Sequence, residues 1–223
     1  MNVESQRPPE AESNAETPRA VATRFIEQAN ISDPKIKQLL LEKVIHRLNE
    51  AEEQELEKYA TENNITLPVD FVGPGKISHH ETLPGGQNQL LVAKELNGCM
   101  AVLIYSETAD GRRRSILSHQ PPDLVSDEYY QRLKELIDVD SADAVKMHAV
   151  IYANKRRGER VATETAAWLQ KTGDGKIVTD EPVYYQTSKQ DADMGLFMAT
   201  IPAENEQDAN FSAVRIPRSE VLS

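Results

Sequence analysis

Residues 97–105 read Asn97-Gly98-Cys99-Met100-Ala101-Val102-Leu103-Ile104-Tyr105 and form the most apolar run of the chain. Every position from Met100 to Tyr105 is apolar, so both faces of the strand that this run predicts must be covered. We therefore expect this strand at the centre of the fold.

Other short runs have the composition of β-strands, and they lie at residues 90–95, 115–118, 145–152, 183–187, 195–201 and 211–216. Two helical patterns interrupt them, one beginning after a Ser126 cap and the other spanning about 158–170. Strands and helices are mixed too unevenly for a regular doubly wound sheet. The pattern therefore predicts an α+β fold.

The N-terminal third differs from the rest in composition. Residues 1–18 are rich in Glu, Ser, Pro and Asn, which predicts a disordered tail. Residues 19–66 are expected to form an N-terminal helical extension, in which Asp33-Pro34 is a helix start and an apolar stripe follows at the helical spacing. Turn residues at Leu67-Pro68 then mark the boundary of a main domain over 67–223.

Composition limits the classes of partner and compartment. The 223 residues carry a net charge of -11 at pH 7, which would repel nucleic acid and anionic lipid. No apolar run is long enough to insert into a membrane, and the first 20 residues contain no signal-peptide core. A single cysteine cannot form an internal disulfide, which fits a reducing compartment. The expected protein is cytoplasmic and soluble.

The candidate site combines the lone cysteine with one histidine. Cys99 follows a tight Asn97-Gly98 turn, which can leave its sulfur at the rim of the sheet. His119 would return to the same rim if the strands on either side of a turn at residues 108–111 pair as a hairpin. A neighbouring imidazole can take the thiol proton and create a nucleophile for acyl transfer or amide hydrolysis.

Simpler interpretations compete with this one. A lone cysteine in an apolar strand is often a small buried hydrophobe, and His119 precedes Pro121 where a surface histidine would also fit. His79 and His80 form a second cluster, but adjacent residues of an extended segment point to opposite faces and rarely bind one metal. We therefore expect no metal and no cofactor.

The order of these features resembles the CheD family of chemoreceptor glutamine deamidases and, more distantly, the deamidases of the cytotoxic necrotizing factor type. In that family a Gly-Cys turn leads into an apolar strand, a hairpin, and a histidine followed closely by proline. Gly98-Cys99, the strand to Tyr105, and His119-Gln120-Pro121 follow this order, and the resemblance spans roughly residues 78–204.

The resemblance implies a β-rich, sandwich-like core flanked by helices, in which Cys99 attacks a protein glutamine side chain and His119 serves as base and then acid. A third catalytic group is not fixed by the motif, since Ala93 stands where the family has threonine. Asn97, Gly98, Ser118 and Thr82 are the candidates for supporting roles.

Two further hypotheses stay open. The chain is either a catalytically silent relative that binds a protein partner through its helical extension, or an interaction protein whose Cys99 is simply core. Replacing Cys99 would distinguish the core hypothesis from the enzyme hypothesis, because a core role predicts lost stability and a catalytic role predicts lost activity. The sequence leaves the oligomeric state open.

Overall fold

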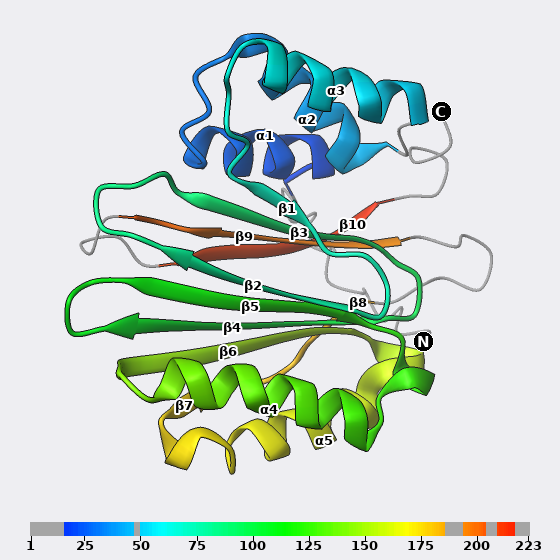
Figure 1. Ribbon diagram of the computed structural model, residues 1–223. Helices are drawn as coiled ribbons and strands as arrows, with labels where there is room; N and C mark the ends of the chain where they lie inside the picture. Colours follow the sequence, from blue (N-terminus) through cyan, green and yellow to red (C-terminus); the bar gives the residue numbers. More distant parts are fainter. Residues whose placement is uncertain (1–15, 47–49, 186–193, 204–208, 217–223) are drawn as a thin grey trace, which may run out of the picture.

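The computed structural model describes residues 16–46, 50–185, 194–203 and 209–216. It confirms the predicted α+β class and arranges the elements in four layers (Figure 1). Two β-sheets lie face to face, three helices cover the outer face of one sheet, and two helices cover the outer face of the other. Residues 1–15 of the predicted tail lie outside the described part, whereas Thr17 and Pro18 begin the first helix.

The N-terminal helices are α1 (Pro18–Gln28), α2 (Pro34–Ile45) and α3 (Glu50–Glu62). Thr17 and Asp33 cap the first two, since their side chains accept hydrogen bonds from backbone N–H groups of the first turn. Fully buried side chains such as Phe25 and Leu40 form one core cluster with the adjoining sheet. The predicted helical extension is thus a layer of the sandwich.

The sheet beneath these helices has the strand order β1-β3-β9-β10. Its strands are β1 (Val69–Phe71), β3 (Gln89–Leu96), β9 (Met194–Ile201) and β10 (Asn210–Ile216). β1 runs parallel to β3, and the other neighbours are antiparallel. β1 was not predicted because three residues are too few to display an alternating pattern.

The second sheet has the order β2-β5-β4-β6-β7, with β8 also pairing with β6. Its strands are β2 (Lys76–Thr82), β4 (Met100–Thr108), β5 (Arg113–Gln120), β6 (Ala144–Asn154), β7 (Ile177–Thr179) and β8 (Val183–Tyr185). β4 lies in the middle, as predicted. Met100 and Val102 face the outer helices, whereas Ala101 and Leu103 face the other sheet, so both faces are buried.

The outer helices of this sheet are α4 (Asp127–Ser141) and α5 (Lys155–Leu169). Ser126 caps α4, as predicted, and Asn154 caps α5, so α5 begins about three residues before the predicted start. Short 3-10 turns occupy Pro122–Leu124 and Gly173–Gly175. Among the described residues, no helix combines the length and apolar character needed to cross a bilayer.

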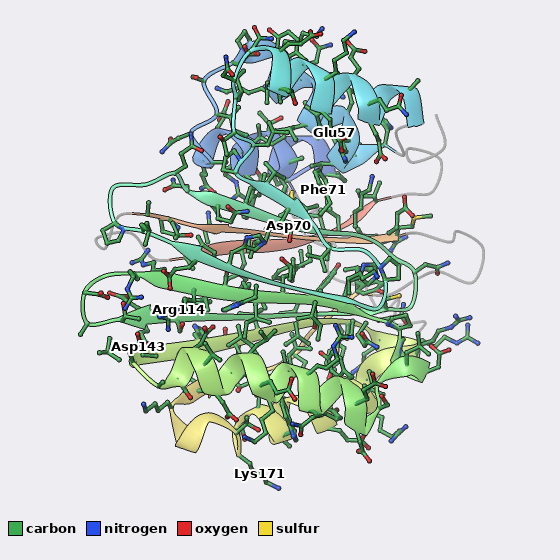
Figure 2. The ribbon with its side chains drawn as sticks, in the orientation of Figure 1. Glu57, Asp70, Phe71, Arg114, Asp143 and Lys171 are labelled. Carbon is green, nitrogen blue, oxygen red and sulfur yellow. The ribbon has the colours of Figure 1, made fainter. Side chains whose placement is uncertain are left out.

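One end of the sandwich is closed by charged side chains. Arg114 of β5 donates to Asp143 at 2.5 Å and to Glu81 of β2 at 2.7 Å, and Figure 2 shows Arg114 and Asp143 at the end that carries the β4–β5 turn. Met100 and Gln120 pair at the opposite end of the same hairpin. The sequence-predicted site therefore lies at the end away from this ionic network.

Candidate active site

The β4–β5 hairpin brings the two predicted side chains to one edge of the sheet. β4 and β5 are antiparallel, with Ala101 opposite His119 and Met100 opposite Gln120. Cys99 directly precedes β4, so it is the diagonal neighbour of His119, a position whose Cα separation is about 7 to 8 Å in antiparallel sheets. Both residues face the space between the two sheets, where Cys99 and Ala101 belong to one apolar cluster. No hydrogen bond joins the two side chains in this structure.

His119 is fully buried and is oriented by the opposing sheet. Its Nδ1 lies 3.0 Å from the carbonyl oxygen of Val72, just after β1, and its own carbonyl accepts a hydrogen bond from Gly75 N–H at 2.7 Å. Val72 is in turn tied to β3 through a hydrogen bond to the carbonyl of Val92. The ring is thus positioned by a rigid backbone group.

This contact fixes the protonation of the imidazole. A carbonyl can only accept a hydrogen bond, so Nδ1 must carry the proton and Nε2 holds the lone pair of the neutral ring. Nε2 is buried and has no hydrogen-bond partner among the described residues. Burial lowers the pKa of His119, although the Val72 carbonyl and Glu95 act in the opposite direction. The ring therefore rests as a neutral base.

Cys99 lies at the edge of a cavity that opens to solvent. The residue is 8% exposed and borders an open cavity of about 450 Å³. The cavity is lined by residues 97–99, by Pro121–Asp123 and by the start of α5. Burial raises the pKa of the Cys99 thiol, Asp123 raises it further, and Arg157 lowers it. Cys99 lines the cavity and His119 does not, so a ligand in the cavity would meet Cys99 first.

The turn before Cys99 has an unusual backbone. Glu95 has φ +58° and Gly98 has φ +81°, and β3 loses regular register with β9 between Ala93 and Leu96. Left-handed conformations of a non-glycine residue occur most often where a surrounding structure holds them in place. Tyr185 of β8 stabilises this turn, because its buried hydroxyl donates to the carbonyl of Cys99 at 2.9 Å and to the carbonyl of Leu96.

Of the four predicted supporting residues, two lie beside Cys99 and two lie away from it. Asn97 and Gly98 line the cavity beside Cys99, and the Asn97 carbonyl lies 3.9 Å from the sulfur. Ser118 faces the outer helices, where its hydroxyl contacts that of Tyr129 at 2.9 Å, because successive strand residues point to opposite faces. Thr82 pairs with Arg113 at the far end of β2, about 20 Å along the strand from Lys76, the partner of His119. Neither Ser118 nor Thr82 can support Cys99.

His79 and His80 point to opposite sides of β2, as predicted. His79 contacts Asp140 of α4 at 2.9 Å, whereas His80 contacts Asp70 of β1 at 2.9 Å. In the described part of the chain, no three His, Cys, Asp or Glu side chains lie close enough to hold a metal ion.

The sequence did not indicate two residues that support the site. Val72 acts through its backbone carbonyl, and Tyr185 acts through its hydroxyl from the three-residue strand β8. A backbone carbonyl leaves no sequence signature, because every residue has one.

Comparisons with known proteins add one structural likeness. No protein-family model matches the chain, and no curated protein matches it. Among solved structures, the chain is similar to the C-terminal domain of CNFy from Yersinia pseudotuberculosis, with a TM-score of 0.30 and 8% sequence identity. The match covers 68% of this chain and 64% of that chain.

Proposed function

We propose that the protein is a cysteine-dependent amidohydrolase that deamidates glutamine side chains of a protein substrate. The observation that carries this proposal is the lone pair of His119 Nε2, which is buried and unpartnered on the sheet face that also carries Cys99. A buried polar atom without a partner is costly, so its retention beside a thiol that borders a cavity favours a catalytic role.

In the proposed reaction, Nε2 of His119 takes the thiol proton as sulfur attacks the side-chain carbonyl carbon of glutamine. The tetrahedral intermediate collapses, the C–N bond breaks, and the imidazolium gives its proton to the departing ammonia. A thioester remains on Cys99. Water, deprotonated by Nε2, then attacks this thioester, the C–S bond breaks, and the products are glutamate and the free thiol.

The neutral resting states of both groups agree with this sequence of steps. A buried thiol with a raised pKa is protonated at rest, and a buried imidazole with a lowered pKa is unprotonated. Proton transfer would then accompany attack, and the hydrogen bond between the two groups would form when the substrate is bound. Hydrogen bonds of catalytic groups are often long or absent before substrate binds.

The Val72 carbonyl is the third member of the proposed set and replaces the side chains that the sequence suggested. Its contact with Nδ1 keeps the ring in one tautomer and stabilises the imidazolium that forms during the reaction. The choice of glutamine among amides rests on the resemblance of residues 98–121 to the CheD family.

The proposal is tested by incubating the protein with glutamine-bearing proteins from the same cell and with synthetic peptides. Peptide mass spectrometry would detect the conversion of glutamine to glutamate. We expect conversion by the wild type and none by Cys99→Ser or His119→Gln. Asn97→Ala is a matched variant at the cavity rim, and we expect it to retain activity. Equal conversion by Cys99→Ser and the wild type would exclude the mechanism.

A catalytically silent module that binds a protein partner is the second candidate. The raised pKa of the Cys99 thiol favours it, because most nucleophilic cysteines have a lowered pKa. Its binding surface would be the layer α1–α3, which contributes none of the described residues that line the Cys99 cavity. In that case the Cys99→Ser variant would keep partner binding and no deamidation would occur.

A further inference from the structure

A positive charge borders the Cys99 cavity at the start of α5. Arg157 and Arg160 both line the cavity. Arg157 lies directly against the turn before the cysteine, since a Cβ atom placed on Gly98 would stand 3.0 Å from its Cδ and 3.5 Å from its Nη1. The Arg157 guanidinium is therefore next to the residue that precedes the proposed nucleophile.

The charge of Arg157 is uncompensated, unlike the charges of Lys155 and Arg160. Lys155 pairs with Glu159, and Arg160 pairs with Glu164 at 2.7 Å, both along the helix. The backbone N–H of Arg157 donates to the Asn154 cap, but among the residues that the structure describes its guanidinium makes neither an ion pair nor a hydrogen bond. Its donors are thus free to bind a ligand, and a guanidinium fits a carboxylate through two parallel hydrogen bonds.

The negative net charge of the protein makes a cation at the site important for any acidic substrate. The net charge of -11 repels anionic substrates at long range, so an acidic substrate needs a local cation at the site. The only acid among the described lining residues is Asp123, which lies on the 3-10 turn Pro122–Leu124 rather than on α5.

Building on the proposed deamidation, we propose that Arg157 selects glutamines that have an aspartate or glutamate as the adjacent residue. Arg157 and Cys99 line the same cavity, and the Arg157 side chain lies against Gly98, the residue before the cysteine, so two adjacent substrate residues would reach both side chains. The amide would meet the thiol while the neighbouring carboxylate meets the guanidinium.

Two alkylating reagents test the charge of this site on the intact protein. Iodoacetate and iodoacetamide react with a thiol in the same way, but only iodoacetate carries a carboxylate. The ratio of their rates at Cys99 is independent of the thiolate fraction, because that fraction affects both rates equally. We expect Arg157→Gln to lower the ratio of iodoacetate to iodoacetamide rates about fivefold, the order of magnitude for one solvent-exposed guanidinium in contact with the carboxylate of the reagent.

Arg156→Gln is the matched control, since Arg156 is exposed, precedes Arg157 and does not line the cavity. This variant should leave the ratio unchanged, and 1 M salt should reduce the ratio of the wild type toward that of Arg157→Gln. An equal fall of both rates in Arg157→Gln would mean that Arg157 only stabilises the thiolate, and it would overturn the inference. An unchanged ratio would overturn it as well.

Peptides complete the test with the reaction itself. The wild type should deamidate a Gln-Glu peptide with a higher kcat/KM than a Gln-Ala peptide, and Arg157→Gln should remove that preference. Equal kcat/KM values for the two peptides in the wild type would defeat the inference and leave the deamidase proposal intact. Absence of deamidation of every peptide would instead defeat the deamidase proposal, and the substrate preference with it.

Discussion

At the scale of single residues, the burial of His119 couples stability to pH. The folded state lowers the pKa of His119 below its ordinary 6.5, so the unfolded chain binds a proton first as the pH falls. The stability from neutral burial is complete above pH 6.5 and declines as the pH falls below it. The hydrogen bond to Asp140 raises the pKa of His79, so the stability that His79 contributes is lost as the pH rises. We therefore expect the unfolding free energy of the wild type to fall more steeply on acidification than that of His119→Gln. Urea titrations on both sides of pH 6.5 would measure this, and equal slopes would contradict it.

The same scale shows how far the sequence predicts the site. Cys99 and His119 were predicted as a pair because the turn residues between them indicate a hairpin, and the structure places both residues at the same end of that hairpin. Ser118 was misplaced because a shift of one strand position reverses the face on which a side chain lies. The carbonyl of Val72 comes from a segment distant in sequence, and only the packing of the two sheets brings it to His119.

At the scale of elements, the turn at residues 95–99 is the part of the site most sensitive to backbone change. Gly98→Ala places a side chain at φ +81° and against Arg157, so we expect a loss of about 1 to 2 kcal/mol and a slower reaction at Cys99. Gly85→Ala is the matched control, because Gly85 has φ +72°, has nothing within 4 Å of the added atom and lies away from the site. Thermal unfolding and alkylation rates would compare the two variants. A Gly85→Ala variant that slows alkylation equally would show that the contact with Arg157 is irrelevant.

Tyr185 gives a second test of this turn. Tyr185→Phe removes the hydroxyl that donates to the carbonyls of Leu96 and Cys99, and it leaves two buried acceptors without that donor. We expect a destabilisation of about 1 to 3 kcal/mol and a lower alkylation rate at Cys99. Tyr184→Phe is the control, since the Tyr184 hydroxyl makes one long contact within the described part of the chain, with Thr163 at 3.5 Å. Equal unfolding free energies of the wild type and Tyr185→Phe in denaturant titrations would show that the Tyr185 hydroxyl does not stabilise the turn.

The elements themselves were predicted unevenly for a physical reason. β4 is apolar at every position from Met100 to Ile104 because it is buried on both faces, and such strands are easily identified. β2 was missed because it lies at a sheet edge and is mostly polar, so that Ile77 is its only apolar residue.

At the scale of the whole molecule, three apolar clusters hold the four layers together, and the cluster beneath α1–α3 contributes no residue to the lining of the Cys99 cavity. Phe25 is fully buried in the cluster between α1–α3 and their sheet, whereas Cys99 belongs to the cluster between the sheets. We expect Phe25→Ala to cost about 3 to 5 kcal/mol, with the alkylation rate of Cys99 unchanged in the folded fraction. A changed rate under conditions where the variant is fully folded would show that the helical layer acts on the site.

The pH dependence of Cys99 alkylation by iodoacetamide tests the proposed pairing of thiol and imidazole most directly. Because burial raises the thiol pKa above its ordinary 9.0, an unassisted thiol would react slowly at neutral pH. We expect the wild type to react at pH 7 about tenfold or more faster than His119→Ala, since general-base assistance is lost in the variant, and both proteins to converge at alkaline pH. Superimposable profiles for the wild type and His119→Ala would contradict the account.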